Sequence, residues 1–127
     1  MKIVAMIARL LMGLAFVVFG LNGFFHFIPN GPMPGGAAGQ FVGALVQSHY
    51  MYVVSGLQLV CGLLFLANRY VPLALTLLGP VIVNILLFHI LMERTGLPIA
   101  ILVTVLWFVI FFQHKQYFSG IFTQKAS

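Results

Sequence analysis

Acidic side chains are almost missing from this sequence. Of its 127 residues, six are Lys or Arg and only Glu93 is acidic, so charged residues make up 6% of the chain. A soluble domain normally carries charge on roughly a quarter of its positions. With 62% hydrophobic residues and a mean hydropathy of +1.14, the chain has more apolar surface than a water-soluble core of this length could hide. The composition excludes an ordinary soluble domain. The basic residues form no patch with interleaved aromatic residues, so we expect no nucleic-acid partner.

Cysteine is scarce as well. Cys61 is the only one, so the chain has no internal disulfide and no Cys-x-x-Cys couple for dithiol exchange with a quinone. Because Cys61 lies in a long apolar run, we interpret it as a small buried apolar residue. The sequence also lacks a Gly-rich phosphate loop and a Ser/His/acid set, and we therefore assign no catalytic residues.

What the sequence does contain is four long apolar runs, at about 3–28, 50–67, 71–92 and 97–116. Each is close to the 20 or so residues that an α-helix needs to cross about 30 Å of hydrocarbon. The first run is longer than the apolar core of a signal peptide, and we interpret it as a retained membrane helix. We predict an all-α fold, a four-helix transmembrane bundle that forms a single integral membrane domain over residues 1–127.

A short amphipathic segment follows the turn-rich stretch after the first run. Apolar residues recur in it at i, i+3, i+4 and i+7, namely Ala38, Phe41, Val42 and Leu45. This spacing predicts a helix with one apolar face, and glycine and glutamine occupy the other face. We expect an interfacial helix at 37–48 that covers the outer mouth of the bundle.

The basic residues indicate how the bundle lies in the membrane. Five of the six fall at the amino end, between the second and third runs, or at the carboxyl end: Lys2, Arg9, Arg69, Lys115 and Lys125. With four spans, these three places share one side of the membrane. Because Lys and Arg are enriched in cytoplasmic loops, we predict that both termini are cytoplasmic.

Polar residues inside apolar runs need a reason, and most of them lie toward the opposite, outer side. Asn22 and His26 close the first run, and His49 precedes the second. His89 and Glu93 close the third. Asn22/His26 and His89/Glu93 are i, i+4 pairs, so each pair presents one face of its helix.

Two more polar residues, Gln58 and Asn84, lie about two turns deeper in the membrane. At about 100° per residue, Asn84 is about 140° away from His89, and Gln58 is about opposite His49. We therefore expect that one cavity does not collect them all. The candidate ligand-binding set is Asn22, His26, His89 and Glu93, with His49 in reserve.

Three chemical interpretations of this set stay open. Its histidines could bind a metal or a haem, although no His-x-x-x-His spacing favours this. Its imidazole and amide groups could hold the carbonyl oxygens of a quinone, or a lipid headgroup, at the top of an apolar cavity. Finally, these side chains could simply form hydrogen bonds between helices or contact water at the interface.

Small residues suggest where helices meet. Gly13 and Gly20 are seven residues apart and mark one face of the first run that a neighbouring helix can approach closely. That face and the Gly-rich segment 37–48 support a rival hypothesis, a non-catalytic scaffold or assembly factor that docks onto partner membrane or redox proteins. A transport protein is a further alternative, and it would require a homo-oligomer because four helices enclose little room.

The first run contains the segments ARLLMGLAF (8–16) and FGLNGF (19–24), and the chain also has a short NRY turn at 68–70 and a Gly79-Pro80 pair four residues before Asn84. This order of residues resembles the DoxX family of small four-helix bacterial membrane proteins. The resemblance implies a protein of the bacterial inner membrane, with some relatives linked to thiosulfate:quinone oxidoreduction or to redox-stress complexes. It supplies no catalytic residues. We accordingly expect a redox-associated subunit that binds a quinone-like or other lipophilic molecule in the outer half of the bundle.

Overall fold

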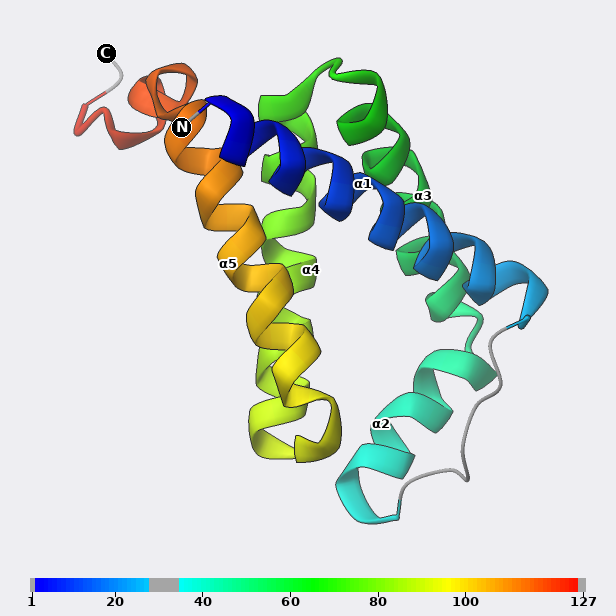
Figure 1. Ribbon diagram of the computed structural model, residues 1–127. Helices are drawn as coiled ribbons and strands as arrows, with labels where there is room; N and C mark the ends of the chain where they lie inside the picture. Colours follow the sequence, from blue (N-terminus) through cyan, green and yellow to red (C-terminus); the bar gives the residue numbers. More distant parts are fainter. Residues whose placement is uncertain (1, 28–34, 126–127) are drawn as a thin grey trace.

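The computed structural model describes residues 2–27 and 35–125. Over these residues the chain is largely helical and has no strand, so the predicted all-α class is confirmed. In chain order the helices are α1 (Lys2–Phe25), α2 (Gly36–Gln47), α3 (Tyr50–Ala67), α4 (Val71–Leu91), the 3-10 helix η1 (Arg94–Gly96), α5 (Leu97–Gln113) and the 3-10 helix η2 (Lys115–Phe122) (Figure 1).

The helix ends differ slightly from those predicted. The first run was predicted to end at residue 28, which lies outside the described residues, but α1 already ends at Phe25 because His26 takes a left-handed φ of 53°. Helix α2 is shifted by one residue from 37–48. The fourth span was predicted as 97–116, but α5 ends at Gln113. The reason lies in His114, whose imidazole Nδ1 is 2.9 Å from the Ile110 carbonyl while its backbone N–H donates to Phe111 O. The side chain thus takes the carbonyl that the next α-helical bond would use, and the chain continues as η2.

Four stretches of the described chain are long and apolar enough to cross a membrane: Lys2–Phe25, Tyr50–Ala67, Val71–Leu91 and Arg94–Gln113. Large apolar side chains on them are exposed on the outside of the bundle, as at Leu14 (56% exposed) and Ile99 (58% exposed). Water would disfavour such a surface, whereas hydrocarbon would not. The protein is therefore a multi-pass membrane protein whose helices contact lipid.

The closest helix contact joins α1 and α3, and glycine makes it. A Cβ atom added at Gly20 would be 2.8 Å from Ser55 O, and one added at Gly62 would be 2.8 Å from Gly13 O. These distances place the two backbones against each other, which only residues without a side chain allow. The predicted close approach at Gly13 and Gly20 is confirmed, and α3 is the helix that makes it.

The two ends of the bundle carry different features (Figure 1). Both termini and the α3–α4 turn lie at one end, called here the terminal end, and α2 and the α4–α5 turn lie at the other, called the α2 end. Arg9 joins two helices near the terminal end: its Nη1 donates to the carbonyl of Phe65 and lies 3.4 Å from Leu66 O. Both carbonyls belong to the last turn of α3, where Phe65 O also accepts from Asn68 N–H at 3.2 Å, so Arg9 adds a side-chain donor to the C-terminal cap of this helix.

Packing is uneven along the bundle. On α3, α4 and α5 the largest fully buried side chains lie toward the terminal end, namely Cys61 and Phe65, Leu75 and Leu78, and Ile110, whereas Met12 and Phe16 lie near the middle of α1. Cys61 is 0% exposed, as predicted for a small apolar residue of the core. Toward the α2 end α1 stays beside α3 and diverges from α4 and α5 (Figure 1). Fewer side chains are buried there, which leaves room for a cavity.

Candidate functional site

A cavity of about 870 Å³ lies between α2, α3 and α4 at the α2 end, and we call it the α2 cavity. This volume falls in the range of about 300–1,000 Å³ that is typical of small-molecule sites. Most of its wall is apolar and includes Phe41 and Leu45 of α2, Leu57 of α3, and Ile85 and Phe88 of α4. Polar groups enter the middle of the wall from Gln58, Asn84 and His89, and Ser48 and Tyr50 add hydroxyl groups where α3 begins.

His89 is held firmly in the cavity wall. Its Nδ1 lies 2.9 Å from the backbone oxygen of Glu93. A carbonyl can only accept, so Nδ1 must carry the hydrogen, and the Nε2 atom of the neutral ring then has a free lone pair. The ring also packs on Gly96, where an added Cβ would be only 2.4 Å from Cε1 of His89. The edge of the Phe88 ring faces it as well, with 5.1 Å between ring centroids.

Asn84 folds back on its own helix. Its Nδ2 donates to Pro80 O at 2.8 Å, in the i to i−4 direction. This bond orients the carboxamide and leaves its Oδ1 and second N–H without a partner among the described residues.

Gln58 of α3 is the third polar group of the wall. Its side chain is half-buried and makes no hydrogen bond within residues 2–27 and 35–125. A carboxamide can donate twice and accept twice, and at membrane depth an unpaired amide is costly. The α2 cavity thus combines a long apolar wall with amide and imidazole groups that still have capacity for hydrogen bonds.

The structure does not gather the five sequence-predicted residues in one cavity; His89 alone lines the α2 cavity. The Glu93 side chain instead accepts hydrogen bonds from Thr95, with its Oε1 3.0 Å from Thr95 Oγ1 and 3.4 Å from Thr95 N. Glu93 therefore stabilises the α4–α5 turn, and the expected His89/Glu93 pair is joined through the backbone oxygen rather than the carboxylate.

Asn22, His26 and His49 lie at the same end of the bundle, outside the wall of the α2 cavity. His26 follows the end of α1 with a left-handed φ of 53°, and its N–H donates to Asn22 O at 2.8 Å. His49 precedes α3 with a φ of 64° and stacks on Tyr52, which itself stacks on Phe24. These three residues thus belong to the α1–α3 side, because the glycine contact holds α1 on α3 while the cavity opens between α3 and α4.

Gln58 and Asn84 line the cavity, although the candidate set predicted from the sequence did not include them. We expected Asn84 and His89 to face different cavities because they are about 140° apart around the helix. That expectation holds only if a cavity contacts a narrow strip of the helix. In the structure the cavity wall on α4 is a broad stripe at 77, 80, 81, 84, 85, 88 and 89. The periodicity of that stripe, with Asn84 at its centre, was the sequence signal for this face.

Among the described residues, no group of three or more His, Cys, Asp or Glu side chains is placed to hold a metal ion. No protein-family model, curated protein or solved structure matches the chain. The DoxX resemblance accordingly stays a prediction from the sequence.

Proposed function

We propose that this protein binds a quinone-like or other lipophilic small molecule with a polar head in the α2 cavity. The observation that carries the proposal is the wall itself, in which the amides of Gln58 and Asn84 and the imidazole of His89 enter a mainly apolar cavity of about 870 Å³. Such a site suits a ligand that is mostly apolar but needs a few directed hydrogen bonds.

The polar groups match both redox forms of a quinone. A quinone has carbonyl oxygens that only accept, and the N–H groups of Gln58 and Asn84 can donate to them. A quinol has hydroxyl groups that donate, and the free Nε2 of neutral His89 and the amide oxygens can accept from them. The apolar tail would lie along Leu57, Ile85 and the rest of the apolar wall. A redox-associated role is supported further by the resemblance to the DoxX family.

The proposal includes a location. Lys2 begins α1, Arg69 lies between α3 and α4, and Lys115 begins η2, so all three are at the terminal end. The preference of basic residues for the cytoplasm then puts both termini inside a bacterial cell and the α2 cavity in the outer half of the inner membrane. In this orientation α2 lies at the outer surface, between the cavity and the solvent.

The rival scaffold hypothesis has less surface available than the sequence indicated. The Gly13 and Gly20 face is covered by α3, so a partner protein has no access to it. On α2, a Cβ at Gly43 would meet nothing within 4 Å, so this face of the helix is open. Of the two surfaces that the scaffold hypothesis named, only α2 remains available to a partner protein. Purification in mild detergent separates the two functions: a stoichiometric protein partner with no lipophile favours the scaffold, and a single chain with a bound lipophile favours the ligand site.

The binding site is tested with a photoreactive quinone analogue and matched variants. Gln58→Met keeps the length of the side chain and removes its hydrogen bonds, and Gln47→Met makes the same change on α2 outside the cavity wall. His89→Ala is matched in the same way by His26→Ala. We expect Gln58→Met and His89→Ala each to weaken labelling by about three- to tenfold, the effect of one lost hydrogen bond. The two controls should label like the natural sequence.

Equal labelling of all four variants would remove the α2 cavity as the binding site. Loss at His26 but not at His89 would move the ligand to the α1 side, where Asn22 and His49 also lie.

A further inference from the structure

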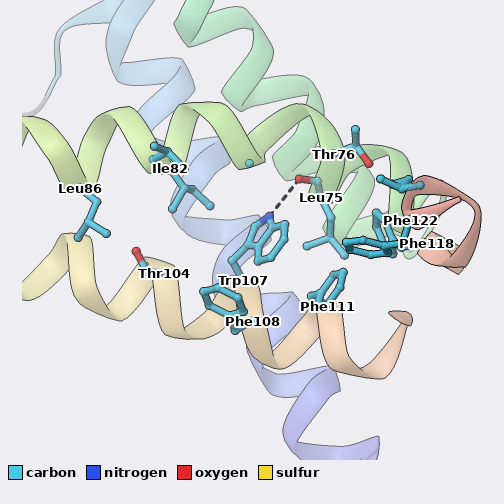
Figure 2. A pocket seen from close by; sticks show the side chains of 13 residues that line it. Leu75, Thr76, Ile82, Leu86, Thr104, Trp107, Phe108, Phe111, Phe118 and Phe122 are labelled. Atoms are coloured by element: carbon cyan, nitrogen blue, oxygen red, sulfur yellow. Dashed lines mark hydrogen bonds between the residues drawn. The ribbon is translucent and has the colours of Figure 1, made fainter. Parts of the chain in front are cut away.

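A second cavity, of about 660 Å³, lies between α4, α5 and η2, and we call it the η2 cavity. It shares no lining residue with the α2 cavity, because the two use different faces of α4. Figure 2 shows its wall, with Trp107 and Phe111 of α5 opposite Leu75 of α4, and Phe118 and Phe122 of η2 at one end. Nothing in the proposed function uses this cavity.

Among the residues that the structure describes, no side chain in the wall of the η2 cavity has a free hydrogen-bond donor. Its polar side chains are Thr76, Thr104 and Trp107. Thr76 Oγ1 donates to Pro72 O at 2.9 Å, and Thr104 Oγ1 donates to Ala100 O at 2.8 Å. Trp107 Nε1 donates across to α4, to Leu75 O at 3.0 Å (Figure 2). Each donor is already bonded to backbone, so the cavity favours an occupant made of hydrocarbon.

The charge around the η2 cavity is positive on one side. The cavity ends at η2, and η2 begins with Lys115, three residues before the buried Phe118. The terminal end also carries Lys2 and Arg69, whereas the single acidic residue of the chain, Glu93, lies at the α2 end. Basic residues at the membrane surface attract anionic headgroups. An occupant whose hydrocarbon part enters the cavity would therefore gain from a negative charge near the level of Lys115.

From these observations we propose that the η2 cavity holds one acyl chain of an anionic phospholipid, with the lipid phosphate near Lys115. The apolar wall takes the chain, and the basic terminal end takes the phosphate. Exposed apolar residues of η2, Ile121 and Phe122, line the same cavity and would cover the chain where it enters. This site is separate from the α2 cavity, so it stands or falls independently of quinone binding.

Trp107 is the only tryptophan of the chain and lines the η2 cavity, so its fluorescence reports on the occupant. The protein in detergent micelles is titrated with phosphatidylglycerol that carries bromine on its acyl chains. We expect saturable quenching at stoichiometric amounts of lipid. Brominated phosphatidylcholine, with the same chains and no net charge, should quench only at higher amounts. Native mass spectrometry of the same samples should show one retained phosphatidylglycerol for each chain.

Two variants separate the chain site from the phosphate site. A Cβ at Gly79 would lie 3.9 Å from Cζ2 of Trp107, an ordinary contact, and Gly79 lines the cavity, so the longer side chain of Gly79→Leu would extend into it. It should abolish lipid retention. Gly56→Leu is its matched control, because a Cβ at Gly56 meets Phe24 at 3.8 Å and Gly56 lines neither cavity. Lys115→Gln leaves the core untouched and should weaken retention of phosphatidylglycerol by about fivefold.

Three results would each overturn the proposal: equal quenching by the two lipids, unchanged retention by Lys115→Gln, or a protein dimer that carries no lipid. The last result would mean that a second copy of the chain covers the η2 cavity. Because Lys115→Gln is outside the core, the test remains decisive even if Gly79→Leu does not fold.

Discussion

Replacing Gly62 by alanine adds one methyl group between α1 and α3. In the structure that Cβ would lie 2.7 Å from the backbone N of Val17 and 2.8 Å from Gly13 O. Both are backbone atoms, so no rotamer change can relieve the contact. The shorter distance is about 0.7 Å below the 3.4 Å at which ordinary contact begins, and the two helices must separate by about that much.

A gap of about 0.5–1 Å forfeits a quarter to a half of each van der Waals contact across it. Overpacking of this kind costs about 1–3 kcal/mol, and the better helix propensity of alanine returns only about 0.5–1 kcal/mol. We therefore expect Gly62→Ala to lower the free energy of unfolding by about 1–2 kcal/mol. Gly43→Ala on α2 is the control with the opposite sign, because a Cβ there meets nothing within 4 Å and the propensity gain is unopposed.

The assay is reversible unfolding in mixed micelles, followed by circular dichroism as the denaturing detergent is increased. The natural sequence, Gly62→Ala and Gly43→Ala are compared under identical conditions. If Gly62→Ala were as stable as the natural sequence, the close contact of α1 with α3 would be refuted.

Three further outcomes follow from the same structure. Gly96→Ala would put a Cβ 2.4 Å from Cε1 of His89, so the ring must move, and quinone photolabelling should fall as in His89→Ala although the histidine is still present. Arg9→Leu should lower stability by about 1–3 kcal/mol in the same unfolding assay, because it removes the charged donor that bonds Phe65 O and Leu66 O and so ties α1 to the end of α3. A smaller loss in Arg9→Lys would show that charge rather than the two-carbonyl geometry matters. A reporter that is active only in the cytoplasm should be active when it is fused after residue 127, and one that is active only in the periplasm should be inactive there. The opposite result would reverse the predicted orientation.

The spans of this fold follow from the sequence, because the thickness of a bilayer fixes the length of an apolar helix. The exceptions are the ends of the first and fourth spans. Helix α1 ends at Phe25, before the left-handed His26, and α5 ends at Gln113, where the His114 side chain binds the Ile110 carbonyl. Apolar runs alone do not show such a local bond, since it depends on the rotamer of one side chain.

The arrangement of the helices around the bundle is harder to predict. Helices that are apolar on all sides give little sign of which face packs and which faces lipid. The glycines of α1 did mark a packing face, but only the structure shows that α3 occupies it. That choice decides the candidate site, because it places Asn22 and His26 beside α3 and leaves His89 to share a cavity with Gln58 and Asn84.

The bundle is tightly packed toward the terminal end and loosely packed toward the α2 end. Backbone amides near Phe16, Phe65 and Leu78 should exchange with solvent only when the whole protein unfolds, since their side chains are almost completely buried. The α2 end buries few large side chains, so it can open at a much smaller cost. Local opening of α2 would therefore admit a molecule dissolved in the membrane to the α2 cavity while the rest of the bundle remains folded.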